Sequence, residues 1–247
     1  MKLLIFNFIL LILILIILNF IIWSILTYYI FKWINNKIQL KYFFDSHKKI
    51  SNTVLDKYGD FPVKKIYLLR RPVPLYLRVI LDIITCKSYS NQLNNYRKIF
   101  KDYDFYPMHT YIIVEVKLKN KLRKWIAIEK FNAVDITPYF TYSYNEDIME
   151  LKLNKKDKFT INKILTLTKE NMGSSLFYNW HFYNNNCQKF ILKILESINK
   201  KSSRYEKFIY QEKFTETVKF SELSLYLANN LNNLYSLVEC LYYKFLL

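Results

Sequence analysis

The chain has 247 residues, with 37 Lys plus Arg against 20 Asp plus Glu, which gives a formal net charge of +17 at pH 7. Only two glycines occur, so the glycine-rich phosphate loops of nucleotide-binding proteins are excluded. The three cysteines have no CxxC spacing and support neither a disulfide framework nor a cysteine zinc site; no cofactor or metal is predicted.

A long apolar run opens the chain. From Leu3 to Phe31 the residues are almost all Leu, Ile, Phe, Trp and Tyr, without a charge. A bilayer-spanning helix needs roughly 20 apolar residues, and a cleaved signal peptide has an apolar region of only about 7 to 15. The run therefore predicts a retained transmembrane anchor over residues 1–34. Lys32, Lys37 and Lys41 follow it closely, which predicts a single-pass protein with its C-terminal domain in the cytosol.

The remaining chain divides into a polar, basic juxtamembrane linker at residues 35–60 and one domain at residues 61–247. The excess of positive charge indicates an anionic partner. With an anchor predicted, membrane lipids are the simpler choice, and no nucleic-acid-binding motif is present. The sequence carries no signal for the oligomeric state.

The first helix of the domain is predicted at Leu75–Cys86, after Pro62 and the prolines of the 70–74 run. Its polar residues Arg78, Asp82 and Thr85 recur at spacings of four and three, which indicates one narrow polar stripe. Such a helix either packs in the core or lies flat in the membrane interface; we favour packing.

A change of period then indicates strands. Apolar and other side chains alternate over His109–Lys119, and Trp125–Lys130 reads as a second strand after a basic turn. The two are expected to pair as an antiparallel hairpin. Val134–Ile136 and Ile148–Leu153 are weaker strand candidates.

Three helical segments follow. The first is predicted from Asp157 to Asn171, with Gly173 as its C-terminal cap. One of the three asparagines at 184–186 caps the next helix, which places Cys187 in its first turn. The last, at Ser221–Leu247, is amphipathic.

The chain thus places a histidine at the start of a strand, a glutamate near the end of its partner strand, and a cysteine at the start of a helix. Backbone N–H groups at a helix N-terminus favour a thiolate and can form an oxyanion hole. A neighbouring histidine takes the thiol proton, and a carboxylate fixes the histidine tautomer.

The segments PMHTYIIVEV, WIAIEKF and YNWHFYNNNCQKFILKIL resemble the permuted papain-like fold of lecithin:retinol acyltransferase relatives and the NlpC group. The resemblance covers roughly Asp102 to Asn199. It implies that His109 is the base, Glu129 the third polar residue and Cys187 the nucleophile. Together with the anchor predicted from the apolar run, it gives the expected fold class: α+β, with an N-terminal transmembrane helix followed by a permuted papain-like domain whose small antiparallel sheet packs against helices. The Asn, Lys, Ile, Tyr and Phe bias resembles predicted thiol enzymes of large DNA viruses of protists.

The resemblance has departures. Many relatives have a histidine at the third position, where this chain has Glu129. A hairpin turning near residues 121–122 would place Glu129 opposite Val114 and not His109. Gln188 is either an oxyanion donor or a solvated first-turn residue, and we favour the latter.

Other residues compete for these roles. His181, six residues before the cysteine, is the rival base, although packing is its commoner role. His47 is interpreted as solvated, and Cys86 and Cys240 as structural residues on apolar helix faces.

Two functions are predicted in consequence. The first is a membrane-anchored cysteine hydrolase or acyltransferase that acts on a lipid or a peptide or amide substrate through an acyl-thioester. The second is a catalytically inactive membrane-anchored interaction module of the same fold. Nucleic-acid binding rests on charge alone and ranks third.

Overall fold

The computed structural model describes residues 51–102, 105–119, 121–131, 134–139, 146–154, 156–211, 218–226 and 229. All of them belong to the compact unit Asp45–Leu247. The predicted anchor at 1–34, His47, Cys240 and most of the 221–247 segment lie outside the described residues.

Within the described ranges, no helix is long and apolar enough to cross a membrane. Helix α3 (Leu75–Ile84), which is almost wholly apolar, has 10 residues, about half of what a bilayer requires. The predicted fold class, which joined a transmembrane helix to the domain, is therefore wrong. The described chain is a mixed α+β domain built on a five-stranded antiparallel sheet.

The strands lie in the order β4-β3-β2-β1-β5, and every neighbouring pair is antiparallel. Their bounds are β1 Val63–Pro72, β2 Met108–Lys117, β3 Arg123–Lys130, β4 Val134–Pro138 and β5 Asp147–Leu151. The predicted β2–β3 hairpin is confirmed, and β4 and β5 coincide with the two weaker strand candidates.

Helices α3 and α4 (Ser88–Phe100) connect β1 to β2, while α5 (Ile161–Met172), α6 (Ser174–Tyr178), α7 (Cys187–Ser197) and α8 (Ser203–Ile209) follow β5. Residues 51–58 are also helical, and their Val54 is buried in the core. The range predicted as linker, 35–60, therefore overlaps an element that packs with the domain.

Strand β1 was not predicted. Its Lys and Arg residues and the nearby prolines suggest a break between elements and not a strand. Its apolar residues nevertheless alternate as a central strand requires. Ile66 and Leu68 face one side of the sheet, and Leu69 faces the other.

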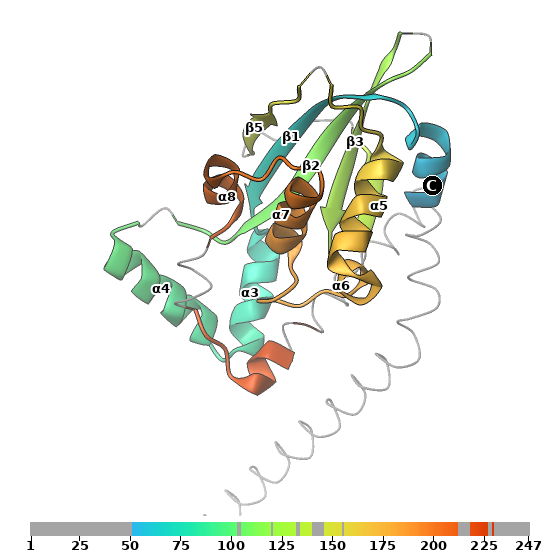
Figure 1. Cartoon of the computed structure of the whole chain (residues 1–247). Coiled ribbons are helices and arrows are strands. Elements are labelled where there is room, and N and C mark those ends of the chain that lie inside the picture. Colours follow the sequence, from blue (N-terminus) through green and yellow to red (C-terminus); the bar gives the residue numbers. More distant parts are fainter. Residues whose placement is uncertain are drawn as a thin grey trace, which may run out of the picture. The chain divides into compact units, whose positions relative to one another are not determined.

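The main core lies between the sheet and two helices. Figure 1 shows α5 and α7 across one face of the sheet. Apolar residues fill the space between them: Ile66, Leu68, Ile112, Val114, Ile128, Ile164, Ile191 and Ile194. The opposite face carries a smaller apolar cluster of Leu69, Tyr111, Ile113 and Ala127.

The register of the β2–β3 hairpin decides where Glu129 lies. The loop closes with a hydrogen bond from the Leu118 backbone N–H to the Leu122 carbonyl (2.8 Å). Facing residues consequently sum to 240, as 111 + 129 shows. The expectation that Glu129 faces Val114 is wrong, because the turn is centred closer to β2 than predicted. Glu129 faces Tyr111 and lies diagonally from His109.

Candidate active site

Cys187 is the first residue of α7, and Asn186 caps this helix. The Asn186 side-chain oxygen accepts from the Lys189 backbone N–H (3.0 Å), and its amide donates to the Phe182 carbonyl (2.9 Å). The predicted capping and first-turn position are confirmed. Cys187 is half-buried and belongs to the first turn of the helix, where backbone N–H groups have no partner within the helix.

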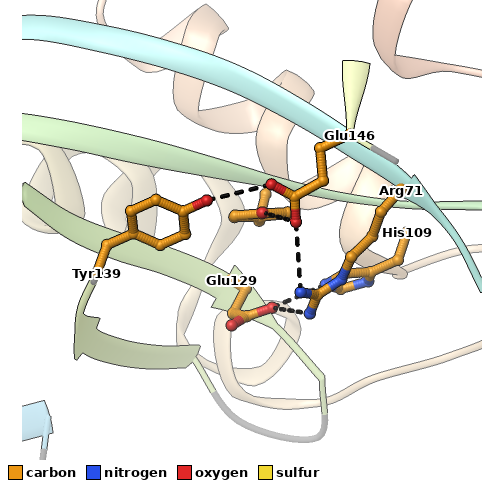
Figure 2. Close-up of polar contacts among 6 residues, drawn as sticks. Arg71, His109, Glu129, Tyr139 and Glu146 are labelled. Carbon is orange, nitrogen blue, oxygen red and sulfur yellow. Dashed lines mark hydrogen bonds and ion pairs between the residues drawn. The ribbon is translucent and has the colours of Figure 1, made fainter. Parts of the chain in front are cut away.

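His109 is the second residue of β2 and is 6% exposed. Its ring packs nearly parallel to the Phe131 ring, with centroids 4.5 Å apart, and to the Tyr111 ring at 6.0 Å. Its Nε2 lies 2.9 Å from Oε2 of Glu129, as Figure 2 shows. The stacked rings and the carboxylate together fix the orientation of the imidazole.

The thiol of Cys187 is electrostatically coupled to His109. Burial alone raises the Cys187 pKa, but the charge of His109 and a hydrogen bond from it reverse this effect, and a backbone hydrogen bond from Thr110 lowers the pKa further. The Cys187 pKa is therefore held below its ordinary value. The Thr110 hydroxyl also lies beside the sulfur, and it is buried without an oxygen or nitrogen partner among the described residues.

The His109 pKa shifts in the complementary direction. Burial lowers it, but the Cys187 thiolate and the Glu129 carboxylate outweigh burial and raise the pKa to about 9. With Glu129 on Nε2, Nδ1 is the ring nitrogen that remains for the sulfur. A lowered thiol pKa beside a raised histidine pKa shifts the equilibrium toward a thiolate–imidazolium pair.

Further polar residues contact Glu129 directly or through one another. Arg71, which faces His109 across the β1–β2 pair, lies 3.5 Å from Glu129 and 3.7 Å from the buried carboxylate of Glu146. Glu146 in turn accepts from the hydroxyls of Tyr111 (2.6 Å) and Tyr139 (3.1 Å). Figure 2 shows this chain of contacts reaching away from His109. Burial raises the Glu129 pKa, but His109 and Arg71 together lower it, so the carboxylate stays ionised.

The side chain of Gln188 has neither of the roles considered from the sequence. It is 6% exposed, so it is not a solvated residue. Its amide donates to the Met108 carbonyl (3.1 Å) and to Gln211 (3.2 Å), and its oxygen accepts from the Gln211 backbone (3.1 Å). Since the side chain is fully engaged, Gln188 ties the first turn of α7 to the start of β2, directly beside His109.

The side chain of Lys130 lies on the other face of β3 and holds the loop that leads into α7. This fully buried ammonium donates to the carbonyls of Leu176 (2.6 Å) and Phe177 (3.1 Å) and to the side chain of Asn185 (3.3 Å). Burial lowers its pKa to about 8. Asn185 also donates to Leu176 and Asn179, so one clamp orders the chain immediately before Asn186 and Cys187.

The remaining candidates lie elsewhere. His181 forms a β-bridge with Asn185, and its Nδ1 accepts from the backbone of Tyr183 and Asn184 (both 3.3 Å), so this ring shapes the turn before α7. Cys86, interpreted from the sequence as a structural residue on an apolar helix face, lies two residues beyond the end of α3 and is exposed. In the described ranges, no group of three or more His, Cys, Asp or Glu side chains could hold a metal ion.

Sequence reasoning missed Arg71, Glu146, Thr110 and Lys130. Thr110 follows His109 directly, but adjacent side chains in a strand point to opposite faces, so adjacency alone did not place Thr110 at the site. Arg71 and Glu146 lie on strands or loops whose pairing the sequence did not reveal.

Comparison of the chain with protein-family models, with curated proteins and with solved structures found no match.

Proposed function

We propose that this domain is a cysteine-dependent hydrolase or acyltransferase that acts through an acyl-thioester, with Cys187 as nucleophile, His109 as general acid and base, and Glu129 as the group that orients His109. The coupled Cys187–His109–Glu129 arrangement carries the proposal: a half-buried thiol at a helix N-terminus, its pKa lowered by a histidine that a carboxylate holds at 2.9 Å. The permuted papain-like resemblance of the same three residues supports it.

The chemistry has two steps. The Cys187 thiolate attacks the substrate carbonyl carbon and forms the C–S bond, and the His109 imidazolium gives its proton to the leaving amine or alkoxide as that bond breaks. A second nucleophile, water or an acceptor alcohol or amine, then attacks the thioester. Neutral His109 takes its proton, and the thiolate is expelled, which restores the starting ion pair.

The developing oxyanion needs donors near the sulfur. The first-turn N–H groups of Cys187 and Gln188 precede the first hydrogen bond within α7, which runs from the Phe190 N–H to the Asn186 carbonyl. Donors at a helix N-terminus are suited to a negative oxygen. The Thr110 hydroxyl, buried beside the sulfur, is a further group that can stabilise the thiolate.

The test is direct trapping of the acyl-enzyme. Intact protein is exposed to a p-nitrophenyl ester and quenched, and the acylated residue is located by mass spectrometry. We expect one acyl group on Cys187, its loss after Cys187→Ser, and no effect of Cys86→Ser at the exposed thiol. Acylation spread equally over Cys86 and Cys187, or persisting in Cys187→Ser, would support the non-enzymatic interaction module instead.

A further inference from the structure

Helix α3 exposes three of its apolar residues. Leu75 is 67% exposed, Val79 49% and Ile83 69%. Because they recur every four residues, they form one stripe along the helix. We call these three residues the α3 stripe.

The polar residues of α3 face the protein instead. The Arg78 guanidinium lies over the Tyr106 ring at 4.7 Å, with its Nε buried. Asp82 accepts from the Ser90 backbone N–H (2.8 Å) at the start of α4. The two polar residues are thus half-buried and contact neighbouring parts of the domain, and these contacts help to fix the rotation of α3 that leaves the apolar stripe exposed.

Charge distinguishes among possible occupants of this face. Residues 75–101 contain five basic side chains and the single acidic Asp82, and Lys87, Lys98 and Lys101 are exposed. A second copy of the chain carries the same local excess and a net charge of +17, so electrostatic repulsion opposes self-association here. An anionic lipid surface offers both a medium for apolar side chains and the opposite charge.

We propose that the α3 stripe docks the domain onto the surface of an anionic lipid bilayer. The position of α3 gives this docking a consequence for the site. Helix α3 begins three residues after β1 ends, at the end of the sheet where Pro72 pairs with Met108 and Arg71 with His109. Docking therefore brings the end of the sheet that carries His109 toward the bilayer. Resting on the proposed function, this favours an acyl group carried by a lipid as the substrate.

The experiment reads the environment of α3 itself. In the full chain with Cys86→Ser, Cys187→Ser and Cys240→Ser, an environment-sensitive fluorophore is attached at Ile83→Cys. A matched control carries it at Leu122→Cys, which is 59% exposed in the hairpin loop at the other end of β2. Each protein is mixed with phosphatidylserine-containing vesicles or with pure phosphatidylcholine vesicles.

We expect a blue shift and protection from an aqueous quencher at position 83 only, and only with the phosphatidylserine vesicles. Adding Val79→Asp to the labelled chain should raise the lipid concentration at half-maximal shift about tenfold or more, since burying one valine is worth roughly that factor. No shift at position 83, equal shifts at 83 and 122, or equal shifts with both lipids would overturn the proposal. A shift that grows with protein concentration without vesicles would overturn it in favour of self-association. Because Cys187 is absent, failure here is independent of failure of acyl trapping.

Discussion

The two faces of strand β3 have opposite roles in the site. Glu129 points to the face that carries His109, Arg71 and Tyr111, where it takes part in a polar chain that ends at Glu146. Its neighbour Lys130 points to the face covered by α7 and reaches the loop that delivers Cys187. Adjacent residues in a strand alternate between faces. One strand therefore supports both proposed catalytic residues. On one face Glu129 orients His109 electrostatically, and on the other Lys130 orders the backbone that precedes Cys187.

Substitutions on the two faces of β3 should therefore change catalysis and stability to different extents. Glu129→Gln keeps the shape of the side chain but removes the charge that holds His109. We expect acyl transfer to fall about 10²- to 10⁴-fold, a loss that any accompanying decrease in stability cannot explain as long as the variant remains folded. The pKa of His109, raised to about 9 in the native protein, should fall, because a neighbouring anion has been removed.

The pH profile of acyl transfer checks this effect. The alkaline limb, on which His109 loses its proton, should move to lower pH in Glu129→Gln. Glu150→Gln, at an exposed position on the edge strand β5, is the matched control and should leave both rate and profile unchanged. An unshifted alkaline limb in Glu129→Gln would show that Glu129 does not orient His109.

On the face of β3 that packs against α7, substitution should mainly lower stability. Lys130→Met removes the donor of three hydrogen bonds, two of them buried, and should lower the free energy of unfolding by about 2 to 4 kcal/mol in denaturant titrations. Lys124→Met, exposed on the same strand, should change it by about 0.5 kcal/mol or less. Equal effects of the two substitutions would show that the Lys130 hydrogen bonds do not stabilise the loop before α7.

The same lysine gives a pH-dependent prediction. Burial lowers its folded pKa to about 8, whereas the unfolded value is about 10.4. Between these values the unfolded chain binds more protons at this residue, so its contribution makes stability rise with pH and is lost as pH falls through about 8. Across this pH window, the free energy of unfolding should rise less steeply with pH in Lys130→Met than in the native chain.

The smallest effect concerns the helix cap. Asn186→Ala should cost about 1 kcal/mol of stability and should also slow alkylation of Cys187, because the first turn of α7 positions the sulfur. Thr160→Ala removes the equivalent cap of α5, whose side chain accepts from the Lys163 N–H (3.2 Å). It should cost a similar free energy without slowing alkylation. If both variants slowed alkylation equally, the effect would be one of general stability.

Local patterns predicted the elements that hold His109 and Cys187, because strand alternation and an asparagine cap are encoded within a few residues of each. The hairpin register was not predictable in this way. It depends on the hydrogen bond between Leu118 and Leu122, and a shift of three residues decides whether Glu129 can reach His109.

Contacts between distant segments were still less accessible to sequence reasoning. Strand β1 is rich in Lys and Arg, so nothing local indicated that Arg71 would face His109. Gln188 resembles a solvated first-turn residue until Gln211 and Met108 are placed beside it. Such side chains are defined by partners roughly 20 to 100 residues away, as the separations of 23 and 80 for Gln188 illustrate.

The central claim is that His109 activates Cys187, and the pH dependence of Cys187 alkylation tests it most directly. Iodoacetamide labelling of the intact protein is followed by mass spectrometry, with the exposed Cys86 as an internal reference thiol. Because the native Cys187 pKa is lowered, its labelling should persist below the pH at which an ordinary thiol, with a pKa of about 8.5, loses its thiolate. In His109→Gln, burial acts without the compensating charge, so the Cys187 profile should move to higher pH while Cys86 is unchanged. Superimposable Cys187 profiles in the native chain and in His109→Gln would contradict the account.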